Sequence, residues 1–146
     1  MNLQNITGGF LRAVGVLLVI LGLVHLAATP HIPLLLKGIS MDVYERVVGP
    51  TLLNHVLVGI LLLPLGYTTY LASAARNRSQ AWARRILGVN AVVLLTLPLS
   101  IVLFMHRREY YTAPLFITGV AIVGIISLLM VVAVYALVRE RHPVRQ

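Results

Sequence analysis

Histidines are the side chains of this sequence with the clearest capacity for chemistry. The 146-residue chain has five histidines and no cysteine. Neutral imidazole is the commonest metal ligand in proteins and a usual axial ligand of haem iron. The lack of cysteine excludes disulfides, thiolate zinc sites, iron–sulfur clusters and covalently attached c-type haem.

Two of the histidines lie at matching positions in two apolar segments. His25 comes about one helical turn before the end of the first segment, and His55 about one turn after the start of the second. In consecutive antiparallel helices both would lie at the same depth. His106 follows the third apolar segment and falls at the same surface. We predict that these three histidines are the ligands of one site, with four supporting side chains: His31, Asp42, Glu45 and Glu109.

Glycines indicate which way the two intramembrane histidines face. Each histidine shares a stripe of helical spacing with two glycines: Gly15, Gly22 and His25 in the first segment, and His55, Gly59 and Gly66 in the second. Small residues mark the faces where membrane helices approach each other closely. We therefore expect these glycines to pack the two helices together, with both imidazoles directed into their interface.

Two kinds of cofactor fit this set. A b-type haem would take His25 and His55 as axial ligands, with the glycines providing a flat slot. A copper, zinc or iron ion would take three or four nitrogen and oxygen ligands at about 2.0 to 2.2 Å. The sequence has no HExxH or HxxxH motif that would favour one kind. A third interpretation has no cofactor, with the histidines hydrogen-bonding carbonyl groups or water near the membrane surface.

Four apolar segments must position these side chains. The chain is 59% hydrophobic and only 11% charged, whereas a soluble domain has about 25% charged residues. A helix needs about 20 residues to cross the hydrocarbon core. The predicted spans are Phe10–Ala28, Thr51–Leu71, Ile86–Met105 and Ala113–Val138. We predict an all-α integral membrane protein, a four-transmembrane-helix bundle forming a single domain over residues 1–146.

The distribution of charge predicts the orientation of the bundle. The connection between the second and third spans has four arginines and no acidic residue, and the C-terminal tail has three arginines against one glutamate. By the positive-inside rule, this connection and both termini face the cytoplasm. We expect a prokaryotic inner membrane, with the histidines near its outer surface. The arginines expected to contact lipid headgroups are Arg76, Arg78, Arg84 and Arg85.

The first connection, residues 30–50, predicts a short interfacial helix. Ser40 is a suitable N-cap for a helix from Met41 to Val48, and this stretch has an apolar face. Gly49 and Pro50 are typical of a helix end followed by the start of another. We expect the short helix to lie flat on the outer surface.

Three functions agree with this architecture. The first is a membrane redox or metal-handling protein, a subunit or assembly factor whose histidines bind haem or a transition metal. The second is a structural or accessory subunit without a cofactor of its own. The third, a small-solute transporter or channel acting as an oligomer, is disfavoured because the middle of the spans contains no Asp, Glu or Lys.

The composition also limits the partners. We do not expect an enzyme by itself. The basic residues flank apolar segments instead of forming a soluble basic face, so a nucleic-acid partner is not expected. The expected partners are the lipid bilayer and either another membrane protein or a second copy of this chain.

Overall fold

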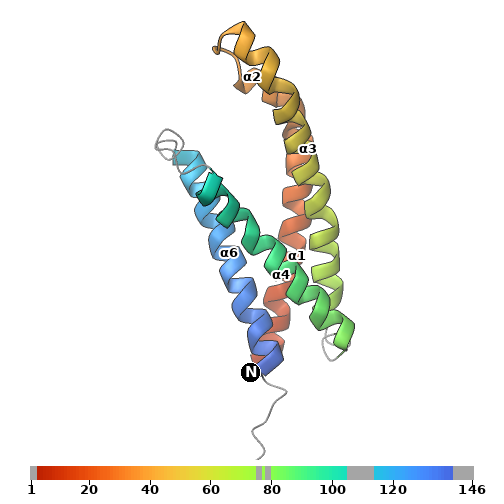
Figure 1. The fold of residues 1–146 in the computed structure, drawn as a ribbon. Helices are drawn as coiled ribbons and strands as arrows, with labels where there is room; N and C mark the ends of the chain where they lie inside the picture. The colour runs from red at the N-terminus through yellow and green to blue at the C-terminus, as the bar shows by residue number, and fades with distance from the viewer. Residues whose placement is uncertain (1–2, 75–76, 78–79, 105–113, 140–146) are drawn as a thin grey trace, which may run out of the picture. The chain divides into compact units, whose positions relative to one another are not determined.

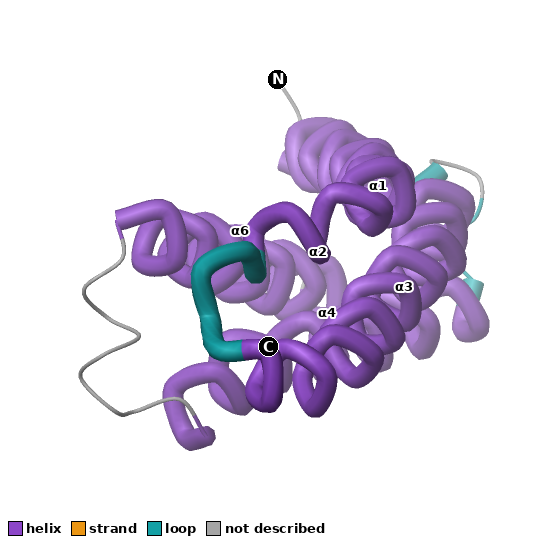
Figure 2. Tube along the Cα trace, turned by 90° about the horizontal axis from the view of Figure 1, so that it is seen from above, coloured by secondary structure: helices purple, strands orange, loops and turns teal. Residues whose placement is uncertain are grey.

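All regular structure in the described part of the chain is helical. The computed structural model describes residues 3–74, 77, 80–104 and 114–139. The elements are α1 (Leu3–Ala28), the 3₁₀ turn η1 (Thr29–His31), α2 (Ile32–Leu35), α3 (Met41–Ala72), α4 (Ala81–Phe104) and α6 (Pro114–Arg139). Figure 1 shows these helices, and Figure 2 shows the loop between α2 and α3. The predicted all-α fold class is confirmed.

Three stretches are long and apolar enough to cross a membrane, as far as the described residues show. They are Ile6–Leu35, Met41–Ala72 and Ala81–Ser100. A helix suits this composition because lipid offers backbone groups no hydrogen-bond partners, and a helix pairs them internally. The fourth predicted span corresponds to α6, which has 26 residues. Within α6, the apolar stretch is Val120–Ala136, which is shorter than the three membrane-crossing stretches.

Large apolar side chains face outward from several helices. Leu23, Val92 and Val132 are 54%, 62% and 62% exposed. Apolar faces of this kind are rare on soluble monomers but are expected where lipid covers a helix. The exposed faces therefore agree with the apolar length of the helices, and the protein is compatible with an integral membrane location.

The predicted short interfacial helix is wrong in its end point. Met41–Val48 is helical, as expected, but the helix continues through Gly49 and Pro50 to Ala72 as the 32-residue α3. Proline fixes φ near the helical value and removes one N–H, so it bends a helix without always ending it. Figure 1 shows α3 as one curved ribbon. The residues before Pro50 thus extend the second span instead of forming a separate helix.

The other boundaries differ from the prediction mainly at helix starts. α1 begins at Leu3 instead of Phe10, and α4 begins at Ala81 instead of Ile86. Hydropathy marks only the residues inside the hydrocarbon core, whereas backbone hydrogen bonding continues beyond it. The ends of the helices agree better with the predicted ends of the spans; α1, for example, ends at Ala28 as predicted.

The chain forms two compact units. One comprises Met1–Val14 and Thr69–Gln146, called here the α4–α6 unit, and the other comprises Gly15–Thr68, called here the α1–α3 unit. Helices α1 and α3 each contribute to both. The α1–α3 unit contains the candidate site.

Buried polar side chains join helices within the α4–α6 unit, where α4 packs along α6. Asn90 Nδ2 donates to Thr69 Oγ1 at 2.9 Å, linking α4 to the last turn of α3. Ser127 Oγ, on α6, donates to the carbonyl of Leu94 at 2.9 Å. All three polar side chains are at least 95% buried. They act in helix packing, because a buried polar group needs a partner.

Candidate functional site

Close backbone contact between α1 and α3 forms the frame of the candidate site. A Cβ atom added to Gly22 would lie 2.8 Å from the carbonyl oxygen of Gly59, and one added to Gly66 would lie 2.6 Å from that of Gly15. Distances this short leave no room for any side chain. The four predicted packing glycines therefore face each other across one interface of the α1–α3 unit.

This interface brings His25 and His55 together. Their ring centroids lie 4.7 Å apart, with an angle of 29° between the ring planes, so the imidazoles stack. His25 lies three residues after Gly22 on α1, and His55 lies four residues before Gly59 on α3. Because residues three or four apart share a helix face, the glycine contact places the two rings side by side. Both side chains are half-buried.

The hydrogen bonds of His25 define its tautomer. His25 Nδ1 lies 3.0 Å from the carbonyl oxygen of Leu21, one turn earlier on α1. A carbonyl oxygen only accepts, so Nδ1 carries the proton in this bond. In the neutral ring, Nε2 then has the lone pair.

Thr29 defines the tautomer of His55 in the same way. The Thr29 hydroxyl donates to the carbonyl oxygen of His25 at 2.9 Å. Thr29 Oγ1 also lies 3.1 Å from His55 Nδ1. A hydroxyl has a single proton, so in the second contact His55 Nδ1 donates and Thr29 accepts. The lone pair of neutral His55 is therefore also on Nε2.

This pattern is the one found around histidine ligands of metals. Such histidines almost always donate their other ring N–H to a carbonyl, carboxylate or water, which fixes the tautomer and ring orientation. His25 donates to a carbonyl and His55 to a hydroxyl. Sequence reasoning missed Thr29. Its position four residues after His25, where a helical hydroxyl can bond the preceding turn, is the signal that could have identified it.

The ring separation can be compared with the geometry of the two predicted kinds of cofactor. Axial imidazoles meet end-on across a porphyrin, and iron–nitrogen bonds of about 2 Å put their ring centres about 6 Å apart. Imidazoles on neighbouring positions of one ion, with bonds of about 2.0 to 2.1 Å, have ring centres about 4.5 to 5 Å apart. The observed 4.7 Å matches the second distance. The glycine contacts bring the α1 and α3 backbones close together on the same faces as the rings.

The remaining predicted residues are distributed more widely. His31 is exposed in η1, and Asp42 and Glu45 are exposed on the first turns of α3. In the described ranges, no group of three or more His, Asp or Glu is placed to hold a metal ion. His106 and Glu109 lie outside the described residues. The described part of the predicted ligand set is thus the pair His25 and His55.

Of the four arginines predicted to contact lipid headgroups, two belong to the described chain. Arg84 is half-buried and Arg85 is exposed, both on the first turn of α4. Arg76 and Arg78 lie outside the described residues. No protein family, curated protein or solved structure matches the chain.

Proposed function

We propose that this protein binds a transition metal ion, copper, zinc or iron, through His25 and His55. It would act as a subunit or assembly factor of a membrane redox or metal-handling complex. One observation carries the proposal: each Nδ1 atom lies within hydrogen-bond distance of an oxygen, at 3.0 and 3.1 Å, and the ring centres lie 4.7 Å apart. With Nδ1 as the donor in both contacts, the two Nε2 lone pairs remain for a metal ion. Imidazole nitrogen suits all three metals. A b-type haem is less well supported, because the stacked rings leave no space for a porphyrin between them.

The proposed setting is a four-transmembrane-helix bundle with both termini in the cytoplasm, in a prokaryotic inner membrane. The 26-residue length of α6 supports a fourth span. The arginines of the connection between α3 and α4 support the orientation. In this setting the histidine pair lies near the outer surface. An ion there would complete its coordination with water or further side chains, and His106 remains the predicted third ligand.

The test is a metal titration of the purified protein in detergent. After chelator treatment, we expect the wild-type chain to bind one Cu(II), Zn(II) or Fe(II) ion, measured by calorimetry and elemental analysis. His25→Ala and His55→Ala should each weaken binding at least about tenfold, since loss of a supporting contact alone costs 10 to 100-fold at metal sites. His142→Ala is the matched control, because it removes a histidine of the predicted cytoplasmic tail.

The outcomes separate the candidate functions. The proposal that His25 and His55 bind a metal ion is wrong if none of the three ions binds. It is also wrong if the His25 and His55 variants bind as the wild type does. Helical circular dichroism should be equal in all variants, which excludes unfolding as the cause of a loss. A Soret band in the purified protein would favour haem.

A cofactor-free accessory subunit is the second candidate. Its support is that both rings already have hydrogen-bond partners within the protein, the Leu21 carbonyl for His25 and the Thr29 hydroxyl for His55. Histidines bonded in this way also stabilise a helix interface without a metal. This candidate predicts no ion but a stable association with another membrane protein, detected by co-purification.

A further inference from the structure

The turn between α2 and α3 borders a cavity that is largely open to its surroundings and separate from the histidine pair. The cavity has a volume of about 500 Å³ and lies entirely within the α1–α3 unit. Its lining is Pro33, Leu34, Leu36, Lys37, Gly38, Ile39, Met41 and Tyr44. Small-molecule sites occupy about 300 to 1,000 Å³. The cavity is thus large enough for an organic ligand and larger than a bare ion needs.

The turn that forms the cavity has a defined backbone. Gly38 has φ of +105°, a conformation that other residues rarely adopt. The chain reverses there, with Lys37 and Ile39 forming an isolated backbone bridge. The N–H groups of Leu36 and Lys37 donate to the carbonyls of Ile32 and Leu34 at 3.2 and 3.3 Å. These bonds hold the lining residues in place.

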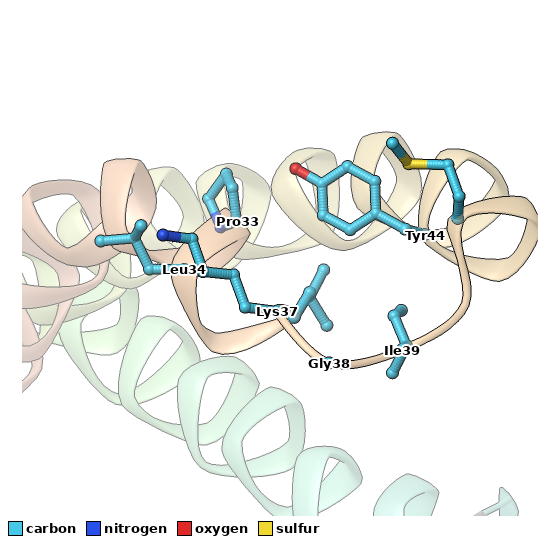
Figure 3. Close-up of a pocket in the computed structure, with 8 residues that line it drawn as sticks. Pro33, Leu34, Lys37, Gly38, Ile39 and Tyr44 are labelled. Atoms are coloured by element: carbon cyan, nitrogen blue, oxygen red, sulfur yellow. The ribbon is translucent and has the colours of Figure 1, made fainter.

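The polar groups of the lining are one cation and one phenol. Figure 3 shows the Lys37 side chain extending past Leu34, and the Tyr44 ring with its hydroxyl directed toward Pro33. The carboxylates of Asp42 and Glu45 are close in sequence but are not part of the lining. The polar part of the cavity is therefore suited to an anion, and the rest of the lining is apolar.

The cavity lies between the two apolar stretches of the α1–α3 unit. One apolar stretch ends at Leu35 and the next begins at Met41. The cavity lining spans this gap, so it lies at the end of both stretches where the chain passes from one to the other. Leu34, Ile39 and Met41 are 53%, 41% and 69% exposed. These exposed apolar side chains are accessible to the acyl chain of a bound lipid.

We propose that this cavity binds an anionic phospholipid. The phosphate accepts hydrogen bonds from the Lys37 ammonium and the Tyr44 hydroxyl, and the glycerol and first acyl carbons lie against Leu34, Ile39 and Met41. Phosphate is a strong acceptor for both donors. A free phosphate would use only the polar part of the cavity, whereas a phospholipid also uses its apolar lining. The site does not depend on metal binding by the histidines.

The test is native mass spectrometry of the delipidated, detergent-purified protein. Phosphatidylglycerol and phosphatidylcholine with identical acyl chains are added in separate titrations. We expect one retained phosphatidylglycerol per chain and at least fivefold weaker retention of phosphatidylcholine. Lys37→Gln should weaken phosphatidylglycerol retention about fivefold, the change expected for one basic group at a membrane surface. Arg46→Gln is the matched control: it removes one positive charge from the same connection, outside the cavity, and should change retention less than twofold.

Two further arms test the cavity itself. Gly38→Ala leaves every charge in place but is strained at φ of +105°, so it should also weaken retention several-fold. Soluble glycerol phosphate should not displace the lipid at equal concentration.

Equal retention of the two lipids would overturn the proposal, as would equal losses in Lys37→Gln and Arg46→Gln. An unaffected Gly38→Ala variant would show that the turn does not form the site. Displacement of the lipid by glycerol phosphate would show that the cavity binds a soluble anion and not a phospholipid. Equal helical circular dichroism of all variants is the folding control.

Discussion

At the scale of single residues, Thr29 connects the two histidines of the candidate site. Its hydroxyl donates to the carbonyl of His25 and accepts from Nδ1 of His55. One side chain thus joins the end of α1 to α3 and sets which nitrogen of His55 is protonated. In the proposed metal site, Thr29 would be a positioning residue that acts on His55 through the opposite ring nitrogen, as supporting groups at metal sites commonly do.

The Thr29→Val variant should release this constraint. Valine keeps the shape of threonine but lacks the hydroxyl, so His55 Nδ1 loses its acceptor and both neutral tautomers become populated. We expect the ¹⁵N spectrum of the His55 ring to change and metal affinity to fall about tenfold. Thr29→Ser, which keeps the hydroxyl, should restore both within about twofold.

The readouts of this experiment are independent. The ¹⁵N spectrum reports the tautomer whether or not a metal binds. Thr96→Val, which removes an exposed hydroxyl bonded to the Val93 carbonyl on α4, is the control and should change neither measurement. An unchanged His55 spectrum in Thr29→Val would show that Thr29 does not determine the tautomer.

At the scale of elements, glycines decide how α1 meets α3. Apolar side chains alone give membrane helices little preference for one another, because lipid is as apolar as leucine. The contact instead depends on positions without side chains, where backbones approach closely. Gly66 is the tightest of them: an added Cβ would meet Gly15 O at 2.6 Å and Val19 N at 2.7 Å. Both are backbone atoms, which cannot move aside without separating the helices.

Gly66→Ala should therefore destabilise the protein. We expect the free energy of unfolding to fall by about 1 to 3 kcal/mol, the usual cost of overpacking, measured by denaturant titration in detergent. Gly88→Ala on α4 is the matched control, because a Cβ there meets nothing within 4 Å. In that open helical position alanine should be neutral or stabilise by about 0.5 to 1 kcal/mol. Equal stability of the two variants would contradict the close α1–α3 contact.

At the scale of the whole molecule, the composition and the three long apolar helices of the described chain are compatible with a bilayer as the solvent. Outward-facing apolar side chains and inward glycines suit a helical protein in lipid. The proposed orientation places the turn of Ser40 outside the cell and the connection of Gln80 in the cytoplasm. Both side chains are exposed, and the natural chain has no cysteine.

Single-cysteine labelling tests this orientation. A membrane-impermeant maleimide should label Ser40→Cys in intact cells, and should label Gln80→Cys only after the membrane is permeabilised. The positive-inside rule requires this result, because the arginines flank Gln80. The reverse pattern would move the histidine pair to the cytoplasmic side, and labelling of both sites in intact cells would contradict a membrane span between them.

Much of the fold could be predicted from the sequence, because the signals are local. Long apolar stretches with few charges require helices in lipid, and the all-helical fold follows from them. The spacing of Gly22 to His25 and of His55 to Gly59 also predicts that each histidine shares a face with a glycine. Helical periodicity is enough to predict these shared faces, so the pairing of His25 with His55 could be predicted from the sequence.

Other features were decided only by the tertiary structure. Whether Pro50 ends or merely bends a helix depends on its surroundings, and α3 runs through it. The stacking of the rings, on which the proposed metal site rests, depends on how closely the two backbones approach each other. The role of Thr29 and the cavity around Lys37 need atoms from separate turns to meet, the latter through the positive φ of Gly38. Sequence determined which segments are helical and which faces pack, because those follow from local periodicity, whereas the chemistry of the site depends on distances between those segments.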